Sequence, residues 1–111
     1  LNAKTTLQTT WSFDGNSTIN GNCNVLDVSD SSACLALTAG STLNLTDVNL
    51  IGVKNATFSM TDSACTVRFS NVTMALQGNV QIDRGQFWVD CCTKSTRTLS
   101  FSNLTINVFF I

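Results

Sequence analysis

A ten-residue pattern of alternating apolar and polar positions occurs three times along this chain. It reads STLNLTDVNL at residues 41–50, CTVRFSNVTM at 65–74 and RTLSFSNLTI at 97–106. The copies begin 24 and then 32 residues apart. Alternation with a period of two is typical of strands that bury one face. The pattern therefore predicts one structural unit that is repeated with a connecting loop of variable length.

The repeated positions superpose as columns of apolar side chains, with one polar column at the bend. Asp and Asn side chains can satisfy the backbone groups of such a corner. We interpret this corner column, which consists of Asp47, Asn71 and Asn103, as structural. The apolar columns are Leu43, Val67 and Leu99; Leu45, Phe69 and Phe101; Val48, Val72 and Leu104; and Leu50, Met74 and Ile106.

Each repeat contains three short strands joined by corners, and no long segment keeps the apolar spacing of a helix. A unit of about 24 residues with three strands is the coil of a parallel β-helix, in which equivalent side chains stack from coil to coil. The sequence therefore predicts an all-β fold, a short parallel β-solenoid of about four coils. The main alternative is a β-sandwich with donor-strand exchange, which would need antiparallel hairpins at Asn20-Gly21 and Gly78-Asn79.

The 111 residues are expected to form a single solenoid domain. The chain begins at Leu1, without Met, which fits either a processed mature protein or an excerpt of a longer one. A long polar loop is expected at residues 90–97. The expected parts are a leading arm or strand at 1–10, a first coil at 11–34, repeats at 35–55, 56–79 and 80–108, and an apolar end at 109–111.

The composition argues against catalysis and against several classes of partner. Charged residues make up 12% of the chain and the net charge is −1, so electrostatics gives no reason to expect nucleic acid as a partner. No apolar run approaches the roughly 20 residues that a membrane-spanning helix needs. The chain has no His and no Glu, and its Asp residues fall mostly in turns. We therefore predict that the protein is not an enzyme and that it holds no metal or cofactor.

Five cysteines give this small chain, rich in Ser, Thr and Asn, a composition that favours an oxidising, extracellular or cell-surface location. They are Cys23, Cys34, Cys65, Cys91 and Cys92. We expect a Cys23–Cys34 disulfide and a second one between Cys65 and either Cys91 or Cys92, which leaves one thiol. Connectivity does not follow from sequence, and the alternative is that some of these residues are buried free thiols in the columns.

Several outward positions are candidate contact or modification sites. Trp88 lies between inward Phe87 and Val89 and should point outward, whereas Trp11 should lie outward or at a coil end, so either Trp is a candidate contact for a sugar or a protein. Sequons of the Asn-x-Ser/Thr type begin at Asn16, Asn44, Asn55, Asn71 and Asn103. Of these, Asn16, Asn44 and Asn55 are the glycosylation candidates, because two lie in turns and Asn44 lies between inward neighbours.

Three stretches carry a resemblance to a known superfamily. They are STINGNCNVLDVSD at 17–30, GSTLNLTDVNLIGV at 40–53 and SNVTMALQGN at 70–79. With these repeats the chain resembles the right-handed parallel β-helix (pectate-lyase-like) superfamily of bacterial surface proteins, and most of all the secreted and polymorphic outer-membrane-type proteins. The resemblance implies a right-handed coil and a role as a surface adhesin, a passenger domain or a wall component.

The carboxyl-terminal stretch LTINVFFI is apolar to its last residue, whereas a solenoid normally carries polar caps. An open terminal coil offers backbone groups to another chain. We therefore predict a non-catalytic extracellular subunit that stacks head to tail on copies of itself into a filament or surface layer. The alternative is an adhesin or glycan-binding segment of a larger surface protein. The predicted assembly interface comprises Leu104, Ile106, Val108, Phe109, Phe110 and Ile111.

Overall fold

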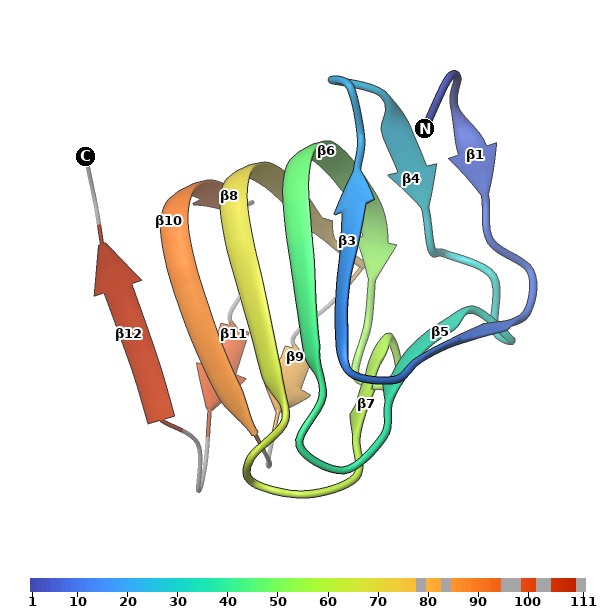
Figure 1. Cartoon of the computed structure of the whole chain (residues 1–111). Helices are drawn as coiled ribbons and strands as arrows, with labels where there is room; N and C mark the ends of the chain where they lie inside the picture. The colour runs from blue at the N-terminus through green and yellow to red at the C-terminus, as the bar shows by residue number, and fades with distance from the viewer. Residues whose placement is uncertain (78–79, 83–84, 95–98, 102–104, 110–111) are drawn as a thin grey trace.

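The structure is a computed structural model that describes residues 1–77, 80–82, 85–94, 99–101 and 105–109, with side chains for 1–77, 80, 85 and 86. Within these residues every element is a β-strand and all nine strand pairs are parallel. The chain winds as a parallel β-solenoid of about three coils (Figure 1). The predicted all-β parallel solenoid is confirmed, with about three coils in place of four.

The strands form one large sheet and two small ones. The large sheet has the order β1-β4-β6-β8-β10-β12, with β3 also paired to β6, and the small sheets are β2-β5-β7 and β11-β9. The bounds are β1 (Thr5–Thr6), β2 (Thr10–Phe13), β3 (Asn16–Asn20), β4 (Val25–Asp27), β5 (Cys34–Leu37), β6 (Thr42–Val53), β7 (Phe58–Met60), β8 (Thr66–Leu76), β9 (Val80–Ile82), β10 (Gln86–Lys94), β11 (Leu99–Phe101) and β12 (Thr105–Phe109).

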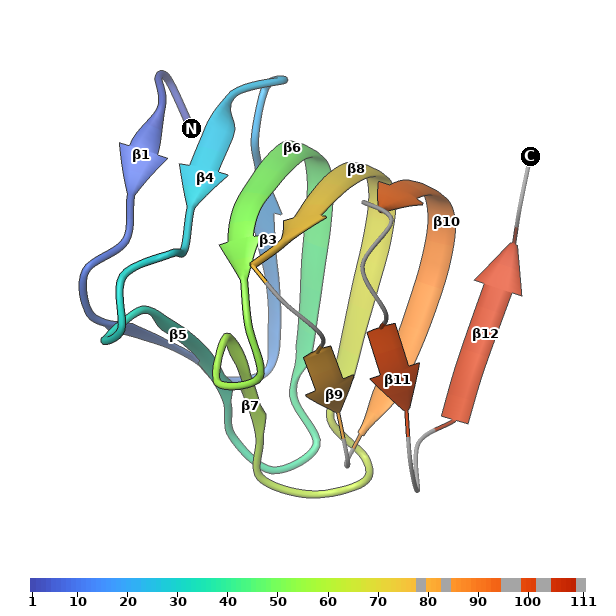
Figure 2. The ribbon, with the colours of Figure 1, turned by 180° about the vertical axis from the view of Figure 1, so that it is seen from behind.

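The long strand β6 shows how the sequence pattern becomes a coil. Its alternate residues Leu43 and Leu45 are fully buried, and the polar residues between them face outward. At Asp47 the backbone takes a left-handed conformation (φ 51°), which turns the strand from one wall into the next. The first part of β6 therefore pairs with β3 on the wall seen in Figure 1, and its later part pairs with β4 on the wall seen in Figure 2.

The core consists of columns that run from coil to coil, as the sequence predicts for its first two copies. Ile19, Leu45 and Phe69 are register partners on successive strands, and all three are buried. Phe69 also meets Phe58 edge to face, with ring centroids 5.9 Å apart. Each such buried side chain contributes roughly 1.5–3 kcal/mol of hydrophobic stabilisation. This packing of side chains between coils, together with the backbone ladders, holds the solenoid together.

The third predicted copy is misplaced. Strand β8 pairs with β10, with Gln86 opposite Thr66 and Cys92 opposite Val72, so the stretch after Gly85 and not residues 97–106 continues the wall. Residues 90–94 are therefore strand and not the start of a polar loop. Phe101 pairs with Ile82 in a separate two-stranded sheet, while Val89 is the register partner of Phe69. Alternation with a period of two occurs in several stretches of the chain, so it does not identify the stretch that pairs with β8. The backbone pairing decides which of these stretches follows β8 in the wall.

The parallel pairing also excludes the β-sandwich alternative. At Asn20-Gly21 the chain passes from β3 on one wall to β4 on the other and forms no hairpin, because β3 and β4 each pair in parallel with β6 and not with each other. The Gly21 N–H donates a 2.8 Å hydrogen bond to the Thr46 carbonyl on the next coil. A Cβ added to Gly21 would lie 2.6 Å from the Val48 Cα and against the Asp47 carbonyl oxygen. Glycine is therefore required there by the close approach of two coils. The second predicted hairpin, at Gly78-Asn79, lies outside the described residues.

Candidate functional site

The two ends of the solenoid carry matching strands. In the described part of the chain β3 pairs only with β6, and β12 pairs only with β10. Both strands have five residues, and both run in the same direction in Figure 1. Each presents one unpaired side, and such edge strands are templates for pairing with another chain.

The register shows that these two strands occupy the same place in the wall. Successive register partners lead across the wall from β3 to β12. Asn16 pairs with Thr42, Thr42 with Thr66, Thr66 with Gln86, and Gln86 with Thr105. The same path leads from Asn20 at the end of β3 to Phe109 at the end of β12. Strand β12 is therefore an in-register counterpart of β3, separated from it by β6, β8 and β10.

The backbone hydrogen bonds show which groups of β3 point to its open side. The Thr42 N–H donates to the Gly15 carbonyl and the Gly21 N–H donates to the Thr46 carbonyl, each at 2.8 Å. Peptide groups alternate sides along a strand, so those of Asn16, Thr18 and Asn20 point away from β6. The Asn20 carbonyl accepts a hydrogen bond from the amino terminus of Leu1. Thr18 lies at the middle of this open side.

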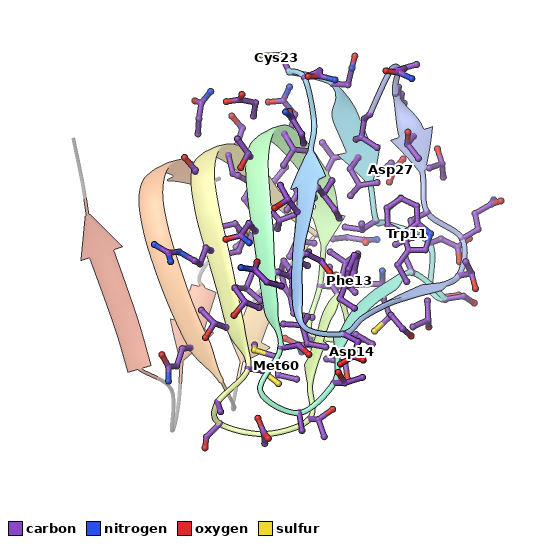
Figure 3. The ribbon with its side chains drawn as sticks, viewed as in Figure 1. Trp11, Phe13, Asp14, Cys23, Asp27 and Met60 are labelled. Atoms are coloured by element: carbon purple, nitrogen blue, oxygen red, sulfur yellow. The ribbon has the colours of Figure 1, made fainter. Side chains whose placement is uncertain are left out.

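Large apolar side chains lie at the β3 end of the solenoid. Trp11 and Phe13 on β2 are half-buried and pack against the core (Figure 3). Leu1 also packs against the core. Among the described residues β2 pairs only with β5, so no further coil covers these side chains. Trp11 thus lies at a coil end, one of the two positions expected for it.

At the opposite end, only part of the predicted assembly interface is described. Ile106, Val108 and Phe109 lie on β12, and the register sets Ile106 and Val108 opposite Phe87 and Val89. Their side chains lie outside the described residues. The same holds for the whole of Leu104, Phe110 and Ile111.

The corner column joins two coils through a side-chain hydrogen bond. Asp47 and Asn71 both have left-handed backbone, with φ of 51° and 55°. The Asn71 Nδ2 donates to the Asp47 Oδ1 at 2.8 Å. Asn103 lies outside the described residues. On β10, Asp90 is the register partner of Ser70, so the next residue, Cys91, holds the corner position that follows Asn71.

The predicted Cys23–Cys34 disulfide is wrong, since both residues are free cysteines in the structure. Cys23 is exposed at the corner after β3, where its N–H donates to the Asp47 carbonyl (Figure 3). Cys34 begins β5, which belongs to a different sheet. Closeness in sequence did not bring the two together, because the chain between them passes from one wall to another.

Cys65 is also free and is buried, with its Sγ 3.2 Å from the Thr38 carbonyl and 3.4 Å from the Asp62 Oδ1. The predicted bond to Cys91 or Cys92 is therefore wrong as well. Cys92 is the register partner of Val72, beyond the corner of β8. The straight run from Thr66 to Ser70 alone spans roughly 13 Å at strand spacing, whereas a disulfide needs Cα atoms within about 7 Å. The side chains of Cys91 and Cys92 lie outside the described residues.

The three glycosylation candidates differ in their surroundings. Asn16 is exposed and its Oδ1 accepts a 2.7 Å hydrogen bond from the Nδ2 of Asn44. The Asn44 Nδ2 donates also to the Ser17 carbonyl at 3.0 Å, so the atom that would carry a glycan is already engaged. Asn55 is exposed in the turn before β7. Trp88, the other outward candidate, is the register partner of exposed Arg68, and its side chain lies outside the described residues.

Two aspartates outside the corner column have lowered pKa values, and hydrogen bonds to their carboxylates explain both. The Asp27 carboxylate accepts hydrogen bonds from the Oγ and N–H of Ser29, at 2.6 and 2.9 Å, and these bonds lower its pKa. The Gly40 N–H donates to Asp62 at 3.2 Å and lowers the pKa of that carboxyl, with further help from Cys65 and Ala64. The Asp27 carboxylate therefore stabilises a turn, whereas the Asp62 carboxylate stabilises its own turn and also binds the Gly40 N–H of the neighbouring coil.

The described residues contain neither a cluster suited to a metal ion nor a helix suited to a membrane. These residues include no group of three or more Cys, Asp, Glu or His side chains suited to a metal ion. No helix in the described part of the chain is long and apolar enough to cross a membrane. Comparison of the chain with protein-family models, with curated proteins and with solved structures finds no match.

Proposed function

We propose that this protein is a non-catalytic extracellular structural subunit that stacks head to tail on copies of itself into a filament or surface layer. One observation carries the proposal. Strands β3 and β12 have equal length, the same direction and equivalent places in the wall. A contact between two different ends of one molecule repeats without closing and so builds a linear assembly.

The half-buried apolar residues at the β3 end support this proposal. Trp11 and Phe13 are inward-facing residues of β2 that no further coil covers within the described chain. Aromatic side chains bury roughly 150–250 Å² each when fully covered. A neighbouring copy that continued the coils would cover them, and it would gain hydrophobic stabilisation at about 25 cal/mol per Å².

The extracellular location and the family are further parts of the proposal. The composition, poor in charge and rich in Ser, Thr and Asn, suits a secreted surface. The cysteines give this less support than the sequence implied, since the three described thiols are free. We place the chain near the right-handed, pectate-lyase-like bacterial surface proteins of the polymorphic outer-membrane type, because its repeats build parallel coils with polar corners.

A second candidate function is adhesion or glycan binding by the outer face of β3, β6 and β8. This face carries Asn16 and Asn44, which are joined by their side chains, with exposed Thr18 and Arg68 beside Asn44 in the register. Amide, hydroxyl and guanidinium groups in rows are suited to hydrogen bonds with sugar hydroxyls.

Light scattering and electron microscopy of the purified chain test the main proposal. We expect concentration-dependent growth of fibres or sheets, accelerated by preformed seeds. A protein that stays monomeric in light scattering and forms no ordered assemblies overturns the proposal. The same monomer applied to a glycan array tests the second candidate, which predicts binding that Arg68→Ala weakens.

A further inference from the structure

We infer that the junction between stacked copies is a direct backbone ladder, in which β12 of one copy pairs in parallel with β3 of the next, with Thr105 opposite Asn16. This inference rests on the proposed function and names the surfaces that carry it. Its partner is a second copy of this chain.

The register predicts this alignment from pairs already present inside the molecule. Asn16 is the partner of Thr42 on the next strand, and Thr105 is the partner of Gln86 on the preceding one. If a second copy is added at the β12 end in the same register, its β3 becomes the next strand of the wall, and its Asn16 lies opposite Thr105. The wall would then continue across the junction without a shift.

The hydrogen-bond pattern inside the solenoid also defines the bonds of the junction. Alternate residues of β6 donate to the carbonyl one position before their partner on β3, as the Thr42 N–H does to the Gly15 carbonyl. In the aligned junction Thr18 lies opposite Asn107. Its N–H therefore donates to the Ile106 carbonyl, and its carbonyl accepts from the Val108 N–H.

The inward positions match in the same alignment. Ser17 and Ile19 are the inward residues of β3, in the columns of Leu43 and Leu45. Ile106 and Val108 hold the equivalent register positions on β12. In the register of the junction, Ile106 of one copy is therefore the partner of Ser17 of the other, and Val108 is the partner of Ile19.

Neither strand carries in its own sequence the features by which proteins usually prevent strand pairing, and the charged group at the β3 edge is the Leu1 amino terminus, which bonds to the Asn20 carbonyl at the end of the strand. Natural edge strands are protected by Lys, Pro or inward-pointing charges. The sequences of β3 and β12, NSTIN and TINVF, contain no charged residue and no Pro. No like-charge repulsion between the two strands opposes their approach, and this favours a second copy as the occupant of each edge.

Proline substitutions on the two open sides test the ladder. In Thr18→Pro the ring replaces an N–H that points away from β6, so the fold keeps its internal bonds while the β3 edge is blocked. We expect elongation at least tenfold slower than in the wild type, with an unchanged circular dichroism spectrum. The matched control Thr18→Val keeps the N–H and should elongate at the wild-type rate.

A reciprocal variant makes the test independent of any single substitution. Val108→Pro blocks the β12 edge and leaves β3 intact, so its elongation should also be at least tenfold slower than in the wild type. An equimolar mixture with Thr18→Pro then offers one intact β12 and one intact β3. We expect this mixture to form heterodimers that grow no further, as measured by analytical ultracentrifugation.

A cross-link checks the register, in a Cys23→Ser background because the exposed Cys23 thiol could form disulfides of its own. The double variant Thr18→Cys with Asn107→Cys should form reducible oligomers on a non-reducing gel, whereas Thr18→Cys with Thr105→Cys should form far fewer. Wild-type elongation by a folded Thr18→Pro, or equal cross-linking in both pairs, overturns the ladder and leaves the proposed function standing. A wild-type protein that never assembles overturns both.

Discussion

The Asn71 side chain donates a 2.8 Å hydrogen bond to the carboxylate of Asp47 on the neighbouring coil, and both residues hold left-handed backbone. Asn and Asp tolerate this conformation better than other residues with a Cβ. The same two side chains therefore turn the wall and join adjacent coils at the turn.

Replacement of Asn71 should separate these two contributions. Asn71→Ala loses the hydrogen bond and strains the left-handed backbone, so we expect a loss of about 2 kcal/mol in the free energy of unfolding. Asn71→Gly loses only the bond and should cost about 1 kcal/mol or less. Urea denaturation measures both. Equal effects of the two substitutions would show that backbone strain at this corner is unimportant.

Substitution of two glycines should have very different costs. Gly21→Ala would bring a Cβ within 2.6 Å of the Val48 Cα, so we expect destabilisation of about 3 kcal/mol. Gly40→Ala meets no heavy atom within 4 Å and only strains a φ of +70°, so it should cost about 1 kcal/mol. Thermal or urea unfolding compares them. A cost for Gly21→Ala no greater than that for Gly40→Ala contradicts the close approach of the coils.

Cysteine alkylation without reductant should follow burial. Cys23 is exposed and should react within the native protein, whereas buried Cys65 should react only after unfolding. Cys34 should react slowly, because burial raises the pKa of its thiol and so lowers the thiolate fraction. Peptide mass mapping with and without denaturant measures this. Recovery of a Cys23–Cys34 disulfide-linked peptide would contradict the structure.

Acid should remove the stabilisation that Asp27 and Asp62 provide. Both have lowered pKa values in the fold, so their contribution is present above their ordinary pKa of about 3.9 and is lost as the pH falls through the folded-state pKa. We expect Asp27→Asn and Asp62→Asn to be less stable than the wild type at pH 7. The difference should close as the pH falls below the folded-state pKa values of the two carboxyls. Unfolding curves at several pH values test this, and a gap of constant size would contradict it.

Much of the fold follows from local features of the sequence. The alternation in 41–50 and 65–74 predicted β6 and β8, and the buried columns of Leu43 with Val67 and Leu45 with Phe69 are present. Local residue chemistry specifies these features, since a period of two and a polar bend are readable from one segment alone.

The strand that follows β8 in the wall is not the one that the sequence pattern predicts. The copy at 97–106 looks more like the first two than the stretch at 86–94 does, yet β10 pairs with β8. Coil closure decides this, because the first strand after Gly85 that reaches the wall takes the open edge of β8. The distance around a coil is a property of the whole chain path, and side-chain similarity does not contain it.

The sequence by itself determined the class of fold, through alternation and corner Asn and Asp residues. Only the tertiary structure decided the register, the separation of Cys23 from Cys34, and the equivalence of β3 and β12. The reason is physical: alternation requires only that one face be buried, whereas register and proximity depend on how successive coils stack. The candidate assembly edges belong to this second group, since a strand becomes an edge only when its neighbours are known.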